Sequence, residues 1–170
     1  MQAALSATLL LAAGSDDWNR IRPAGDAFVI SVPGMLAKRS ATKDTPLGPV
    51  HTAIYSVEHG SSSYVVVYTD YSRDFLEKVG AERLFDAQQA QLVPKLRSEV
   101  SSEQTIRVGS WPGREIVFYS DDRRQITVAR MSLVGERLYA VVGSTRRKGL
   151  PQDDIRRFLD SFEPRPRGRH

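Results

Sequence analysis

The sequence predicts an α+β fold in which a central antiparallel β-sheet of about six to seven strands is flanked by helices. Segments rich in β-branched and aromatic residues occupy 26–72 and 105–144, and glycine- or proline-containing turns separate them. A helical region at 74–100 interrupts these strands, and a second amphipathic segment at 150–162 follows them. Successive strands with one long helical crossover favour an antiparallel sheet with helices packed on it.

Four candidate strands precede the helical region. Phe28, Ile30 and Val32 share one face of a strand that ends at the next Pro-Gly turn. A weaker strand and a loop rich in proline and glycine follow in 35–50. Residues 51–60 and 62–72 predict a hairpin, whose valine run indicates a central strand covered on both faces.

The helical region begins with a capping pattern and contains a proline. Asp74 and Glu77 have the spacing of a capping box, in which the first side chain caps the helix and the second reaches back. Pro94 removes a backbone hydrogen bond, so we expect a kink or break there. The residues that recur at helical spacing and are expected to face the sheet are Leu84, Phe85, Leu92, Leu96 and Val100.

Four further strands and a closing helix are predicted after residue 105. The strands correspond to 105–108, 114–120, 124–134 and 137–144, and Gly135 is expected at the first central position of a two-residue hairpin. Pro151 marks the start of the closing helix, with acidic residues in its first turn. Its expected buried stripe consists of Ile155, Phe158, Leu159 and Phe162.

The stretch GSWPGRE, residues 109–115, predicts a turn between two strands. Gly113 follows Pro112 and is expected to adopt the positive φ of a type II turn. Trp111 is expected to pack over this turn and the edge of the sheet. Arg114 and Glu115 are neighbours in the next strand, so their side chains point to opposite faces and are a poor candidate for a paired catalytic site.

The two ends of the chain differ from the middle. Residues 1–17 include an apolar stretch, 3–13, that suits the central part of a signal peptide, although no Lys or Arg precedes it. We therefore expect a periplasmic or secreted protein, with a cytoplasmic protein carrying an N-terminal helix as the alternative. Residues 18–163 are expected to form a single domain, and 164–170 a disordered basic tail.

Composition excludes several kinds of chemistry. The 170 residues contain no cysteine, which excludes disulfides, cysteine-ligated zinc, Fe–S clusters and thiolate catalysis. The formal net charge is +4, much of it from arginine pairs. Arg156 and Arg157 lie among acidic residues on the polar face of the closing helix, so we interpret them as solvated surface. No specific nucleic acid partner is expected, and no segment is long enough to span a bilayer.

No motif for a metal, a phosphate or a nucleophile stands out. His51 and His59 are separated by about 26 Å along a straight strand, too far to share a metal. Gly109 and Gly113 precede a strand and lack the Lys-Ser/Thr of a phosphate-binding loop. No Gly-x-Ser-x-Gly elbow marks a nucleophilic serine. We therefore assign no catalytic, cofactor-binding or metal-binding residue.

The order and spacing of several sequence blocks resemble a group of uncharacterised bacterial exported domains with the PsbP-like fold. This fold is named after an extrinsic subunit of photosystem II and is similar to that of a Ran-binding nuclear import factor. The resemblance covers about residues 18–162 and rests on PAGDAFVISVPG, YVVVYTDY, LFDAQQAQLV, IRVGSWPGREIVF, ARMSLVGERLYAVVGS and IRRFLDSF. It implies a central antiparallel sheet between helical layers, an α/β/α sandwich, and supplies no catalytic residue.

These observations favour a non-enzymatic accessory or protein-binding domain of the periplasm or cell envelope, whose partner is an unidentified envelope protein. The alternative is a domain that binds a small molecule or an anion, or a hydrolase with an unrecognised site. Aromatic and arginine side chains are common in binding surfaces. The candidate interaction surface consists of Trp111, Arg114, Tyr64, Tyr68, Tyr119 and Tyr139.

Overall fold

A computed structural model describes residues 18–25, 27–45, 48–146 and 153–165 of the chain. The strands and helices are, in order, β1 (Trp18–Ile21), β2 (Phe28–Pro33), β3 (Ala37–Thr45), β4 (Gly48–His59), β5 (Ser62–Asp70), α1 (Arg73–Val79), α2 (Ala81–Leu96), β6 (Ser98–Val108), β7 (Trp111–Ser120), β8 (Ile126–Val134), β9 (Arg137–Thr145), α3 (Asp153–Asp160) and β10 (Glu163–Pro164). The predicted signal-like segment lies outside the described residues.

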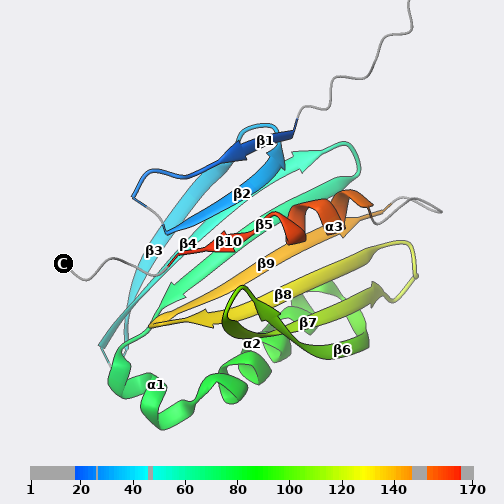
Figure 1. Cartoon of the computed structure of the whole chain (residues 1–170). Helices are drawn as coiled ribbons and strands as arrows, with labels where there is room; N and C mark the ends of the chain where they lie inside the picture. Colours follow the sequence, from blue (N-terminus) through cyan, green and yellow to red (C-terminus); the bar gives the residue numbers. More distant parts are fainter. Residues whose placement is uncertain (1–17, 26, 46–47, 147–152, 166–170) are drawn as a thin grey trace, which may run out of the picture.

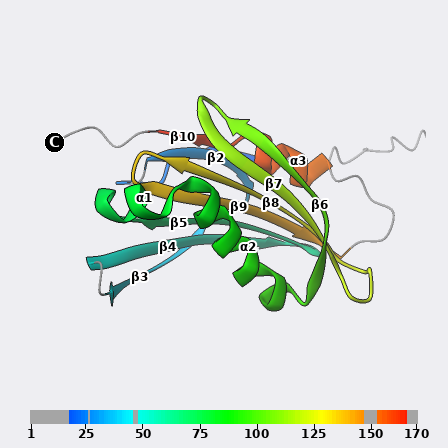
Figure 2. The ribbon, with the colours of Figure 1, turned by 90° about the horizontal axis from the view of Figure 1, so that it is seen from below.

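A seven-stranded antiparallel sheet forms the centre of the molecule, with the strand order β3-β4-β5-β9-β8-β7-β6. One face of this sheet is covered by α3 and by a smaller sheet of β1, β2 and β10, and the other face by α1 and α2 (Figures 1 and 2). The predicted α+β class and the central antiparallel sheet are therefore confirmed. The second sheet was not anticipated.

Each face of the large sheet has its own hydrophobic core. The first core lies toward the small sheet and α3, and its members include Phe28, Ile30, Tyr64, Tyr139, Phe158 and Phe162. The second core lies toward α1 and α2 and consists of Leu84, Phe85, Ile116, Phe118, Ala129, Met131, Leu138, Ala140 and Val142. The apolar residues of β7, β8 and β9 alternate between these two cores, as the period of a strand requires.

The strand at 28–33 belongs to the small sheet. It pairs with β1 on one side and with β10 on the other. Its Phe28, Ile30 and Val32 are completely buried in the first core. Because β10 includes Pro164, and the amide of Arg165 donates to the carbonyl of Ala27 at 2.8 Å, the folded chain extends past the predicted start of the tail.

The helical region differs from the prediction at its start and its break. Ser72 caps α1: its backbone is extended, and its hydroxyl accepts a hydrogen bond from the amide of Phe75. The expected cap, Asp74, lies inside the first turn. The break falls at Gly80, whose backbone, with a φ of 77° and a ψ of 161°, lies outside the helical region and separates α1 from α2.

The end of α2 also differs from the prediction. Pro94 is accommodated within the last turns of α2, which ends at Leu96, and the capping residue Arg97 has the left-handed conformation typical of a helix C-terminus. Leu92 and Leu96 pack against the second core as predicted. Val100 does not continue this stripe, because β6 has already begun at Ser98, seven residues before the predicted strand.

The hairpin between β6 and β7 turns at Gly109 and Ser110, since Val108 pairs with Trp111. Gly109 has the positive φ, 61°, and the prediction that Gly113 would have it was wrong. Gly113 is needed for another reason: a Cβ there would lie 2.5 Å from the backbone oxygen of Met131. Trp111 was predicted to pack over the turn and the sheet edge; in the structure it packs against the first core, on β7, which is an inner strand of the sheet.

Candidate functional site

The structure separates the six residues proposed as an interaction surface. Tyr64, Tyr68 and Tyr139 are 1%, 2% and 0% exposed and belong to the first core, so a partner cannot reach them. Trp111 packs at the margin of the same core, and Tyr119 is partly buried on β7. The remaining residue, the arginine at 114, faces the opposite side of the sheet. The six side chains therefore do not form one exposed surface.

Arg114 connects β7 to the helical layer. Its guanidinium lies 2.6 Å from Glu82 and 2.7 Å from Asp86 of α2, and 3.2 Å from Glu103 of β6. It also lies above the ring of Phe85, 5.6 Å from the ring centre. Although burial alone would lower the pKa of Arg114, these carboxylates raise it above its ordinary value. The side chain thus fixes α2 against the sheet.

Glu115 has the corresponding role on the other face. Its buried carboxylate accepts hydrogen bonds from Arg130 at 2.6 Å, from Arg156 of α3 at 3.0 Å and from Gln104 at 3.0 Å. Burial alone would raise the pKa of Glu115, but the two arginines outweigh it and hold this pKa below its ordinary value. Arg114 and Glu115 therefore attach two different layers to β7, on opposite faces of the sheet.

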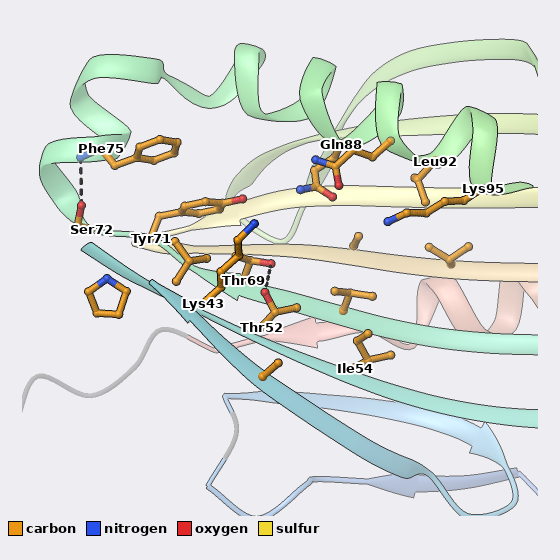
Figure 3. Close-up of a pocket in the computed structure, with 17 residues that line it drawn as sticks. Lys43, Thr52, Ile54, Thr69, Tyr71, Ser72, Phe75, Gln88, Leu92 and Lys95 are labelled. Atoms are coloured by element: carbon orange, nitrogen blue, oxygen red, sulfur yellow. Dashed lines mark hydrogen bonds between the residues drawn. The ribbon is translucent and has the colours of Figure 1, made fainter. Parts of the chain in front are cut away.

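A cavity of about 680 Å³ lies between the β3–β4–β5 half of the large sheet and helices α1 and α2 (Figure 3). The residues that line it are Ala41, Lys43, Pro49, Val50, Thr52, Ile54, Val67, Thr69, Tyr71, Ser72, Phe75, Gln88, Gln91, Leu92, Lys95, Ala140 and Val142. Its size lies within the range of about 300–1,000 Å³ that is common for small-molecule sites. None of the six residues of the candidate interaction surface lines this cavity.

The floor of the cavity is a row of aliphatic side chains on neighbouring strands. Ile54 on β4 pairs with Val67 on β5, which pairs with Ala140 on β9. Val142 lies two residues further along β9, on the same face as Ala140. Ala140 and Val142 also belong to the second core, so the floor continues directly from the core of the protein.

Toward the edge of the sheet, the floor consists of short side chains. Ala41, Thr52 and Thr69 pair across β3, β4 and β5, and the two threonine hydroxyls are 3.2 Å apart. Lys43 and Val50 form the next pair. The short alanine and threonine side chains leave a space between this part of the sheet and α2, and Ile54 is 40% exposed.

The aromatic end of the roof is formed by residues at and after the end of β5. The rings of Tyr71 and Phe75 stack with centres 5.0 Å apart and an interplanar angle of 13°. Burial raises the pKa of Tyr71 above its ordinary value, and a hydrogen bond to Gln88 of α2 opposes this shift. Tyr71 is therefore a neutral hydroxyl at neutral pH, with its ring and hydroxyl placed by α1 and α2.

The charged groups of the lining are two lysines. Lys43 extends from β3 and Lys95 from the last turn of α2, and Figure 3 shows their ammonium groups pointing into the cavity from opposite walls. The described lining includes no aspartate or glutamate. The site is therefore a largely apolar space with two cationic side chains and a few neutral hydrogen-bonding groups.

Two other features were sought in the described residues: a metal site and a helix that could span a membrane. No group of three or more His, Asp or Glu residues in it is arranged to hold a metal ion. His51 instead lies 3.2 Å from the hydroxyl of Thr42 on the neighbouring strand. None of the helices described is long and apolar enough to cross a membrane.

Comparison with known proteins finds no known family that matches the sequence, and no curated protein that matches it. Among solved structures, the chain is similar to that of a protein of unknown function from Pseudomonas aeruginosa, with a TM-score of 0.46 and 11% sequence identity. The similarity covers 88% of this chain and 98% of the other. Similarity at this level carries no argument about function, which must come from the cavity itself.

Proposed function

We propose that this protein is a non-enzymatic binding domain that holds a small, largely apolar molecule in the cavity between the β3–β4–β5 half of the sheet and α1–α2. The observation that carries the proposal is a cavity of about 680 Å³ with an aliphatic floor, an aromatic end and no acidic side chain in its described lining. Small-molecule sites are commonly concave, mostly apolar and provided with few polar groups.

The chemistry of the lining supports binding more than catalysis. The hydroxyls of Thr52 and Thr69 lie next to each other, without an acid or histidine in the described lining that could act as a general base. The tyrosine hydroxyl at 71 is hydrogen-bonded to a glutamine amide, which does not titrate. These groups can orient a ligand by hydrogen bonds.

The cellular location of this domain and its relation to the PsbP-like group are part of the same proposal. The apolar stretch at 3–13 supports export to the periplasm or the medium, and the seven-stranded antiparallel sheet with helices on both faces supports the relation to the PsbP-like group. We propose an envelope protein that carries or senses its ligand. A protein partner, the function favoured by the sequence, is the weaker candidate because its expected surface is divided between two faces.

The binding test uses two tryptophan variants of the same edge strand. Ala41 and Ser40 are adjacent exposed residues of β3, and only Ala41 lines the cavity. We expect N-phenylnaphthylamine, a neutral apolar fluorophore, to bind the wild type and the Ser40→Trp control. We expect Ala41→Trp to weaken this binding roughly tenfold or more, because a large ring occupies the ligand space. Equal affinity of both variants would place the fluorophore elsewhere and contradict the proposal.

A further inference from the structure

The cavity carries two cationic side chains that its apolar lining does not neutralise. Lys43 comes from β3 and Lys95 from α2, so the two charges face the same space from different walls (Figure 3). Among the described residues, neither ammonium group has an ion-pair partner. By contrast, Arg114, Arg130 and Arg137 all pair with carboxylates.

We propose that the ligand of this cavity is a single-chain amphiphile with an anionic end, and that Lys43 and Lys95 hold this end while the chain lies on the aliphatic floor. The proposal rests on the binding function proposed above and adds the chemical class of the ligand. Two like charges that face the same space raise its electrostatic potential, and an anion bound there offsets their repulsion. A cationic ligand of the same shape is repelled.

The position of the lysines assigns an orientation to the ligand. Both lysines are exposed residues, whereas Val67 is partly buried and Ala140 is buried, so the lysines mark the side of the cavity that is nearer to water. The charged end therefore stays near water and the chain enters between the sheet and α2. Lysine binds anionic oxygens as a point charge and makes no bidentate fork, so a carboxylate and a phosphate monoester both fit.

The length of the chain contributes separately from the charge. Burial of one methylene group contributes about 0.8 kcal/mol, so each added methylene tightens binding roughly fourfold until the floor is covered. The inner floor residues, Ile54, Val67, Ala140 and Val142, are aliphatic, and they contact the chain whatever its end group is. Chain length and end group can thus be varied independently. The effect of the end group tests the role of the lysines, and the effect of chain length tests binding in the cavity.

The experiment measures displacement of N-phenylnaphthylamine by decanoate, decyl phosphate, decanol and decyltrimethylammonium at monomeric concentrations. The wild type is expected to bind the two anions roughly tenfold more tightly than decanol, and the cation more weakly than decanol. Lys43→Met and Lys95→Met, which keep most of the apolar stem, are each expected to weaken anion binding roughly two- to fivefold. The double variant is expected to bind anion and alcohol alike.

The matched control is Lys78→Met, an exposed lysine of α1 that does not line the cavity. It removes the same charge and is expected to keep the full preference for anions, at low and at physiological ionic strength. Decanol binding without a preference for anions in the wild type, or equal losses in Lys78→Met and Lys95→Met, would overturn the inference and leave the binding function standing. Failure of every decyl compound to bind would overturn both.

Discussion

Replacing Glu115 by glutamine removes the carboxylate that connects β7 to both β8 and α3. In the wild type, its oxygens accept from Arg130 at 2.6 Å and from Arg156 at 3.0 Å, and the glutamate side chain is 3% exposed. Glutamine has the same shape but a single acceptor oxygen, so its amide group must face an arginine donor. The variant keeps the packing of the strand and loses the charge pairing.

The loss of stability in Glu115→Gln depends on the partners that Arg130 and Arg156 keep. Removal of one partner from a buried ion pair typically costs about 3–5 kcal/mol, because the other charge is left unpaired. Here Arg130 keeps its 2.6 Å contact with Asp160, and the side chain of Arg156 is 40% exposed, so water replaces part of the loss. We expect Glu115→Gln to lower the free energy of unfolding by about 2–3 kcal/mol at neutral pH.

This cost depends on pH, with a sign that the pKa of Glu115 determines. The folded-state pKa lies below its ordinary value of 4.5. The stabilisation is therefore fully present above about pH 4.5 and is lost as the pH falls through the folded-state pKa. The difference in stability between wild type and Glu115→Gln should be constant from neutral pH to about pH 5 and should narrow below that.

Urea denaturation of both proteins at neutral pH and at several acidic pH values measures this difference. Glu103→Gln is the matched control, because Glu103 also pairs with an arginine but its side chain is 40% exposed and Arg114 keeps two other carboxylates. We expect it to cost less than about 1 kcal/mol. Equal costs of the two substitutions, or a cost of Glu115→Gln that does not change with pH, would refute this account of the network.

Three further predictions concern packing and capping. Gly113→Ala places a Cβ 2.5 Å from the backbone oxygen of Met131, and we expect a loss of about 2–3 kcal/mol in urea denaturation. Gly143→Ala meets the side chain of Ile155 at 2.9 Å, which can move, so its cost should be smaller, about 1 kcal/mol; the reverse order would contradict the packing of β7 on β8. Ser72→Ala removes the cap of α1 and should cost about 1 kcal/mol, whereas no loss would mean that water caps this helix equally well.

Several features of the fold could be predicted because they depend on local patterns. Alternation of apolar residues assigned most strands of the large sheet, and helical spacing assigned the buried face of α3 with Ile155, Phe158 and Leu159. The glycine at 135 determined a two-residue hairpin, which the pairing of Val134 with Arg137 confirms. These signals are contained in short segments, so they require no knowledge of the neighbouring elements.

The errors occur where one local rule competes with another or with a distant contact. Two residues near position 74 can cap a helix, and the chain uses Ser72, whose extended backbone follows directly from β5. A glycine between Pro112 and a strand suggested a turn, whereas Gly113 is required by the close approach of β8 to β7. A contact with a strand about twenty residues away leaves no local signal in the sequence.

The sequence by itself determined the α+β class, the main sheet and the opposite directions of Arg114 and Glu115, because strand periodicity is a property of adjacent residues. Only the tertiary structure decided that β1, β2 and β10 form a second sheet, that Tyr64, Tyr68 and Tyr139 are buried, and that a cavity exists. The cavity results from strand pairing that places Ala41, Thr52 and Thr69 side by side under α2. None of these residues signals a cavity in the sequence. The space forms because strand pairing brings three short side chains together at one place.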